Sequence, residues 1–207
     1  MNKIFEEQPY ILHLFINNTH SIKYINNLYQ VNKLFYNNIC NYNYIRYTYK
    51  PKNNQELKNA VNKWCDNPEY YCSKYFGHIS RWNTINITDM SSLFRYAIEF
   101  NEDISLWNTS NVIYMNSMFN NASIFNICIN NWDVSNVVDM NYMFFDAFNY
   151  NQPLDNWNLT NLQYYNNIFE NAFLFNQSLF AFKKYNKQLN STHILNCISF
   201  DIMKYWF

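Results

Sequence analysis

Three side chains near the middle of the chain have the chemistry of zinc ligands: Cys65, Cys72 and His78. A structural zinc site needs four ligands, usually arranged as closely spaced pairs. The spacing here matches no standard site, and a fourth ligand is missing. We therefore expect no metal site, and the sequence assigns no metal-binding residue.

The number and spacing of the cysteines also argue against a disulfide framework. The chain has five cysteines in all, an odd number, and they are irregularly spaced without a C-x-x-C pair. Such a set is not typical of a disulfide framework and favours a reducing compartment. The three not yet named are Cys40, Cys128 and Cys197.

Catalytic residue types are present but do not form a catalytic pattern. The four histidines are scattered along the chain: His13, His20, His78 and His193. No glycine-flanked nucleophile turn is found, and the single glycine, Gly77, rules out a glycine-rich phosphate loop. We expect no enzyme activity, no catalytic residues and no cofactor.

Three methionines recur at a fixed spacing, Met90, Met115 and Met140, and would suit a soft metal ion. Each is followed within a few residues by phenylalanine. Methionine in such surroundings is far more often a filler of the hydrophobic core. We expect core packing at these positions.

The composition limits the classes of partner. The formal net charge is zero, with 15 basic and 15 acidic residues, so no overall field attracts nucleic acid or an anionic membrane. No stretch approaches the length of a membrane span, and the N-terminus lacks the form of a signal peptide. We expect a protein partner, no nucleic acid and no membrane span.

The strongest feature is an internal repeat of 25 residues, which begins at Trp82, Trp107, Trp132 and Trp157. Positions are numbered here as residues after each tryptophan. Positions 4 and 19 are always Asn, position 15 is always Ala, and position 12 is always Phe. Four repeats follow: 82–106, 107–131, 132–156 and 157–181. Repeats of this length indicate stacked units that bury a shared core.

The spacing inside a repeat predicts its secondary structure. Apolar positions 5, 8, 12 and 15 fall on one face of a helix. From position 22 to position 5 of the next repeat, residues alternate and β-branched types are frequent, as in a short strand. The fold class predicted is an α/β repeat solenoid of leucine-rich-repeat type, with about four strand-turn-short-helix turns. The two Asn columns should hydrogen-bond from one turn to the next.

The sequence of the repeat resembles the 25-residue repeat of BspA-like surface and viral proteins. The best local match is residues 132–157, WDVSNVVDMNYMFFDAFNYNQPLDNW. Residues 51–81, with ELKNAVNKW and YFGHISRW, resemble the helix and cap that lead into such repeats. Gly77 is expected there at positive φ. Residues 182–207 are expected to be a degenerate half-repeat and C-terminal cap. The resemblance implies protein contact or adhesion and brings no catalytic residues.

Residues 1–50 lack the repeat and show helical spacing, which predicts a small helical domain. Residues 9–47 weakly resemble an F-box, which would bind a Skp-type adaptor. The alternative is a simple N-terminal cap.

Two pairs of variable positions are the candidates for recognition. Positions 6 and 7 include Tyr114 and Tyr164, and positions 13 and 14 include Tyr96. No binding residue follows from the sequence alone. The function expected is a non-enzymatic protein-interaction module inside the cell, in the host cytoplasm if the protein is viral. The alternative is a surface- or virion-associated structural or adhesion protein.

Overall fold

The computed structural model describes residues 48–71 and 76–185. The chain divides into two compact units, Met1–Ile45 and Arg46–Phe207, and every described residue lies in the second. The prediction of a helical, F-box-like domain over residues 1–50 therefore falls almost wholly outside the described residues. The same holds for the prediction of a C-terminal cap beyond residue 185.

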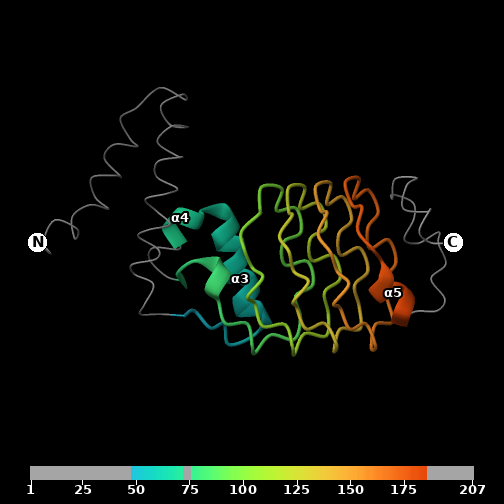
Figure 1. Cartoon of the computed structure of the whole chain (residues 1–207). Coiled ribbons are helices and arrows are strands. Elements are labelled where there is room, and N and C mark those ends of the chain that lie inside the picture. Colours follow the sequence, from blue (N-terminus) through green and yellow to red (C-terminus); the bar gives the residue numbers. More distant parts are fainter. Residues whose placement is uncertain (1–47, 72–75, 186–207) are drawn as a thin grey trace, which may run out of the picture. The chain divides into compact units, whose positions relative to one another are not determined.

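In the described part of the chain, the named helices lie before the first repeat or begin at the end of the last one. Helices α3 and α4 and the 3-10 helix η3 precede the repeats, and α5 begins in the last two residues of the fourth: Asn54–Asp66, Pro68–Tyr71, Ile79–Arg81 and Phe180–Tyr185. Figure 1 shows the repeats as coils stacked between α3 and α5. None of these helices is long and apolar enough to cross a membrane.

Helix α3 forms because its sequence supplies both a cap and an apolar face. The side chain of Asn53 accepts the Glu56 N–H at 2.9 Å, and the Glu56 carboxylate accepts the Lys52 N–H at 3.0 Å. The first bond satisfies an N–H group that a helix start leaves without a partner, and the second ties the residue before the cap to the first turn. The buried face follows helical spacing: Leu57, Ala60, Val61 and Trp64. Trp64 packs edge to face against Trp82, the first tryptophan of the repeats, with ring centroids 6.0 Å apart.

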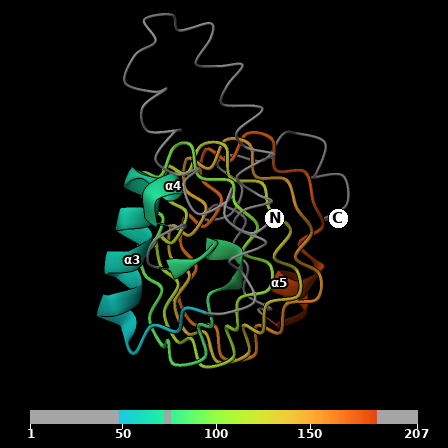
Figure 2. The same ribbon diagram turned by 90° about the vertical axis from the view of Figure 1, so that its left-hand side faces the viewer.

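The prediction of an α/β solenoid of leucine-rich-repeat type is wrong. Between residues 82 and 179 the structure has neither a helix nor a strand. The β-type pairing between adjacent coils in this range consists of isolated parallel bridges along position 7: Asp89 to Tyr114, Tyr114 to Asp139, and Asp139 to Tyr164. Each repeat is a single coil of turns, and Figure 2 shows that successive coils follow nearly the same outline.

The turns explain why the spacing resembled a helix. Leu93 N–H bonds to Met90 C=O at 3.2 Å, and Ala97 N–H bonds to Phe94 C=O at 3.0 Å. These bonds span three residues and not the four of an α-helix. A chain of such turns returns an apolar side chain to the interior every three or four residues. Positions 10 and 14 have φ between 54° and 63°, which an α-helix does not allow.

Hydrogen bonds between coils hold the stack together. The N–H groups at positions 8, 10, 12 and 14 donate to carbonyls at positions 7, 9, 11 and 13 of the next coil. In the first coil the donors are Met90, Ser92, Phe94 and Tyr96, at 2.8–2.9 Å. The positive φ residues therefore contribute to the ladder through their backbone. This regular pairing satisfies backbone groups that would otherwise be buried alone.

The core consists of aromatic columns that run through the stack. One is formed by position 12, with ring centroids 5.4–5.7 Å apart: Phe94, Phe119, Phe144 and Phe169. A second is formed by position 18, at 5.7–6.1 Å: Phe100, Phe125, Tyr150 and Phe175. Met90, Met115 and Met140 are fully buried, so their interpretation as core residues is confirmed.

The Asn columns form the predicted ladders. At position 4, the side chains of Asn111, Asn136 and Asn161 each donate to a backbone carbonyl of the preceding coil at 2.7–2.8 Å. At position 19, the Asn126 and Asn151 oxygens accept the backbone N–H of the next Asn in the column, at 2.9 Å and 2.8 Å. Gly77 has φ 64°, as expected.

Asn54, at the start of α3, accepts hydrogen bonds from the first coil in the way that a preceding coil accepts them from the later coils. In the second coil, the N–H groups of Ile113 and Tyr114 share the Thr88 carbonyl as acceptor. In the first coil, the N–H groups of Thr88 and Asp89 share the Asn54 side-chain oxygen, at 3.0 Å and 3.3 Å. The helix thus closes the open edge of the ladder.

Replacing Asn54 with alanine should lower the free energy of unfolding by about 1–2 kcal/mol, because two backbone donors lose their acceptor. Urea denaturation of the full chain measures this change. Gln55→Ala is the matched control, since among the described residues the Gln55 side chain bonds to Asn59, on the same exposed helix surface. Equal losses for the two variants would show that Asn54 does not close the ladder.

Candidate binding surface at one corner of the coils

The residues with metal or catalytic chemistry do not converge on a site in the described part of the chain. Cys65 and Cys128 are free and exposed, and Cys72 lies outside the described residues. His78 contacts the Ser80 hydroxyl at 2.8 Å and the Glu102 carboxylate at 3.5 Å. Among the described residues, no three His, Cys, Asp or Glu side chains gather where they could hold a metal ion. The other histidines lie outside the described ranges.

A different feature marks one corner of each coil, where positions 10 and 14 have positive φ. The eight residues involved are Ser92, Tyr96, Ser117, Asn121, Tyr142, Asp146, Asn167 and Asn171. Asn and Asp tolerate this conformation because their short side chains can bond locally. Tyr96 and Tyr142 do not share this advantage, and each destabilises the fold by roughly 1 kcal/mol at such a position. The corner therefore carries two aromatic side chains that the backbone does not favour.

These two tyrosines line an open hollow of about 400 Å³ on the corner. The hollow spans the first three coils, and its lining is aromatic and amide-rich: Arg95, Tyr96, Ser117, Asn120, Asn121, Tyr142 and Phe145. Positions 10, 13 and 14 supply every one of these residues. Because the ladder fixes the backbone at these positions, the hollow is part of the rigid stack.

The floor of the hollow is polar and lies in the second coil. Asn120 is only 7% exposed, and its side-chain oxygen accepts the Asn121 amide N–H at 2.8 Å. Its backbone carbonyl accepts the Tyr96 N–H. Among the described residues, the buried side-chain polar atom that lacks a partner is the Tyr150 hydroxyl, so the Asn120 NH₂ is not an orphaned buried donor.

The walls of the hollow are aromatic. Tyr142 and Phe145 meet edge to face, with ring centroids 5.9 Å apart, and form a corner of two ring surfaces. In the first coil, the Arg95 guanidinium lies 4.8 Å from the centroid of the Tyr96 ring and donates to its hydroxyl at 3.1 Å. That contact holds Tyr96, which is 60% exposed, in a defined position.

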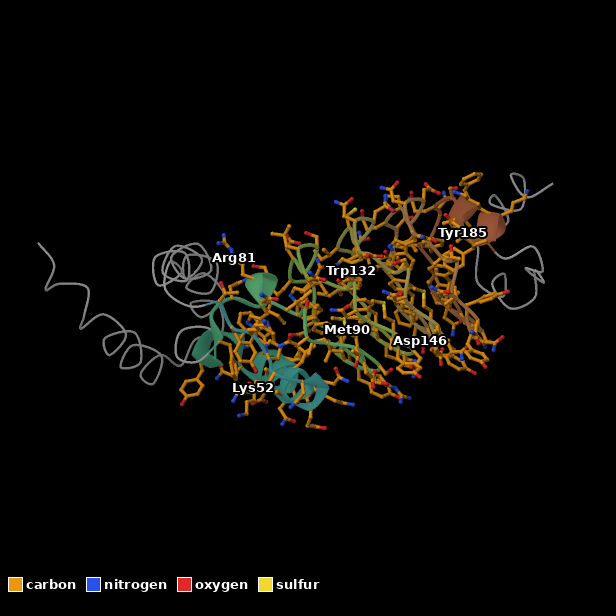
Figure 3. All side chains as sticks on the ribbon, turned by 90° about the horizontal axis from the view of Figure 1, so that it is seen from below. Lys52, Arg81, Met90, Trp132, Asp146 and Tyr185 are labelled. Atoms are coloured by element: carbon orange, nitrogen blue, oxygen red, sulfur yellow. The ribbon has the colours of Figure 1, made fainter. Side chains whose placement is uncertain are left out.

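An exposed apolar edge follows the hollow along each coil, at positions 16 and 17. Its residues are all at least one-third exposed: Ile98, Ile124, Phe148, Phe173 and Leu174. Phe148 and Phe173 stack on each other with centroids 5.5 Å apart. We call the hollow and this apolar edge together the corner surface. Figure 3 labels Asp146, which stands in the sequence between Phe145 of the hollow and Phe148 of the apolar edge.

The sequence predicts part of this surface. The variable positions 13 and 14 supply five of the seven residues of the hollow. Position 10, with Ser117 and Tyr142, and the whole apolar edge do not follow from the sequence. A helix over these positions has no sharp corner at position 10, so the helix prediction did not indicate that these side chains form a surface. Positions 6 and 7 do expose Ile113, Tyr114 and Tyr164, but these residues do not line the hollow.

Comparison with known families identifies the repeat. Searches of curated proteins and of solved structures gave no match. A family model described as "Mycoplasma protein of unknown function, DUF285" matches residues 69–182. This range includes all the coils and agrees with the resemblance to BspA-like repeats. Since the match covers more than half of the sequence, the chain belongs to the DUF285 family.

Proposed function

We propose that the protein is a non-enzymatic protein-interaction module and that the corner surface is its interface. The observation that carries this proposal is the joining of a polar-floored aromatic hollow to an exposed apolar edge. Its mixture of Tyr, Ser, Asn and Arg matches that of antibody combining sites, where tyrosine gives rigid contact area and small polar residues give adaptable hydrogen bonds.

Two physical arguments support the assignment. Exposed apolar residues that gather on one part of a surface are unfavourable in water and are typical of interaction sites. The corner surface also stands on a hydrogen-bonded ladder, so its side chains start from fixed backbone positions. A pre-formed surface loses less conformational entropy when a partner binds.

The experiment is affinity capture with the full chain and with a Phe148→Ser, Phe173→Ser double variant. Serine is the residue that the second coil has at this position, Ser123, so the variant should fold. We expect the wild-type chain to capture specific proteins from eukaryotic and mycoplasma lysates, and the variant to lose them.

The control is Tyr164→Asp, which removes an exposed tyrosine outside the corner surface. Position 7 holds aspartate in two other coils, Asp89 and Asp139, so this change suits the fold. The proposal fails if the double variant and the control capture the same proteins as the wild-type chain.

A second candidate function is that of a surface- or particle-associated adhesion protein, which membership of the DUF285 family favours through its BspA-like character. Binding of the labelled chain to intact cells distinguishes it from an interaction inside the cell. The F-box-like interpretation of residues 9–47 stays a prediction. Capture of a Skp-type adaptor by the full chain, and its loss when those residues are removed, would support it.

A further inference from the structure

We propose that residues 186–207 supply a fifth coil, which closes a row of backbone donors that the fourth coil leaves open. We call this row the donor edge. It consists of the N–H groups at positions 8, 10 and 12 of the fourth coil, those of Tyr165, Asn167 and Phe169. The family match ends at residue 182, so it does not assign this coil. The inference does not rest on the proposed function.

The donor edge has partners in every coil but the last. In the third coil the corresponding N–H groups donate to carbonyls of the fourth at 2.7–2.9 Å: Met140 to Tyr164, Tyr142 to Asn166, and Phe144 to Ile168. The three N–H groups of the fourth coil have no acceptor among the described residues. Phe169 is also fully buried, and a buried N–H without an acceptor is unfavourable by about 1–3 kcal/mol. The edge therefore needs carbonyls placed as those of a next coil are.

The next coil begins in register within the described residues. Phe182 stands 25 residues after Trp157, where a fifth repeat tryptophan would be. Each later repeat tryptophan contacts the position 12 phenylalanine of the coil before it, with ring centroids 5.7–6.5 Å apart. Phe182 makes the corresponding contact with Phe169, edge to face at 5.9 Å, and is fully buried. Helix α5 then ends at Tyr185, which is position 3 of this coil.

The sequence beyond Tyr185 continues the columns of the repeat. Position 4, which is Asn in all four coils, is Asn186. Positions 14–19 read NCISFD, against NASIFN in the second coil and NAFLFN in the fourth. Asn196 suits the positive φ of position 14, Cys197 is small like the alanine of position 15, and Phe200 matches the aromatic column of position 18. Residues 186–207 extend from position 4 to position 25, which is enough for a complete coil.

The departures from the repeat are those of a terminal unit. Positions 5 and 8 are Lys187 and Asn190, where the other coils have mostly apolar residues. The last repeat of a stack has a neighbour on one side alone, and such capping repeats are commonly more polar than inner ones.

The register names the new hydrogen bonds. The carbonyls at positions 7, 9 and 11 of the fifth coil belong to Leu189, Ser191 and His193, and each would accept one N–H of the donor edge. At position 19, the Asn151 side-chain oxygen accepts the Asn176 N–H at 2.8 Å. The Asn176 oxygen would accept the Asp201 N–H in the same way.

A second copy of the chain fits the donor edge less well. Its complementary carbonyls would be those of a first coil, where Asn54 of α3 already closes the ladder. Pairing two fourth coils would bring donors against donors. Residues 186–207 belong to the same compact unit as the coils, so they reach the edge without an association step.

The test is amide hydrogen exchange of the full chain, followed by NMR, together with scalar couplings measured across hydrogen bonds. We expect the N–H groups of the donor edge to be protected as strongly as those of Met140, Tyr142 and Phe144. Couplings should join them, in order, to the carbonyls of Leu189, Ser191 and His193.

Two matched variants test whether the fifth coil provides this protection. Phe200→Ser removes the ring that would continue the position 18 column, and it should speed exchange at the donor edge by about tenfold or more. Ile198→Ser removes an apolar side chain from position 16, where the second coil already has Ser123, and exchange should stay unchanged. Protection in the first two coils should persist in both variants, which shows that the stack stays folded.

Four results would overturn the inference: rapid exchange at the donor edge of the wild-type chain, couplings to carbonyls other than the three named, equal effects of the two variants, or protection that increases with protein concentration. The last result would assign the donor edge to a contact between copies of the chain. None of these results depends on whether the corner surface binds a partner.

Discussion

Replacing Phe119 with alanine is expected to lower the free energy of unfolding by about 3–5 kcal/mol. Phe119 is fully buried in the second coil, where its ring meets Phe125 at 3.9 Å between centroids. It also stacks on Phe94 and Phe144, in the coils before and after, at 5.6 Å and 5.7 Å. Alanine leaves a cavity in the middle of the column, and the ladder prevents the coils from closing it.

Urea denaturation followed by tryptophan fluorescence measures this loss. Phe173→Ala is the control, because Phe173 is 61% exposed and its replacement should change stability by less than about 0.5 kcal/mol. A loss below about 1 kcal/mol for Phe119→Ala would mean that the aromatic columns are not what stabilises the stack.

Replacing Tyr150 with phenylalanine is expected to stabilise the protein by about 1–2 kcal/mol at neutral pH. Tyr150 is fully buried at position 18, where the other three coils have phenylalanine. Its hydroxyl finds no hydrogen-bond partner in the described part of the chain. Removing the hydroxyl keeps the ring stacking and removes the desolvation penalty. Tyr164→Phe, at an exposed site, is the control and should have no measurable effect.

The advantage of Tyr150→Phe should increase at alkaline pH. Burial, and to a smaller extent the nearby Cys128, raises the pKa of Tyr150 well above its ordinary value of 10.0. Above pH 10 the tyrosine ionises in the unfolded chain but stays neutral in the fold. The unfolded state then binds fewer protons, so the stability of the wild-type protein decreases as pH rises. Unfolding curves from pH 7 to 11 test this, and parallel pH profiles for the two proteins would contradict it.

The repeat could be predicted from the sequence because it depends on residue identity at fixed spacing. Four tryptophans and two columns of Asn were enough to predict stacking, a shared core and ladders between coils. The hydrogen bonds of Asn111 and Asn126 follow from this: an identical side chain in each coil reaches the same group of its neighbour.

The secondary structure inside the repeat could not be predicted, because two different backbones give the same apolar spacing. A chain of three-residue turns and a helix both bring positions 5, 8, 12 and 15 to one side. The distinguishing signal lies at positions 10 and 14, where a positive φ forces a corner. Glycine would have revealed it, but these positions hold Ser, Asn, Asp and Tyr. In a chain rich in Asn, the asparagines there gave no clear signal.

The hollow was missed for a related reason. Its residues come from three coils, and no column repeats its composition: position 14 changes from Tyr96 to Asn121 to Asp146. Sequence comparison between coils finds what they share, whereas this surface depends on how they differ. Only the ladder, which places the coils side by side, brings Arg95, Asn120 and Phe145 to one hollow.

The most direct test of the corner surface as an interface is site-specific photo-crosslinking in a lysate. A benzophenone amino acid at Phe148 is compared with the same group at Tyr164, which is similarly exposed but lies outside the corner surface. The proposed function predicts a discrete crosslinked product from position 148 and none from position 164. Equal crosslinking at the two positions, or a product from position 164 alone, would contradict it.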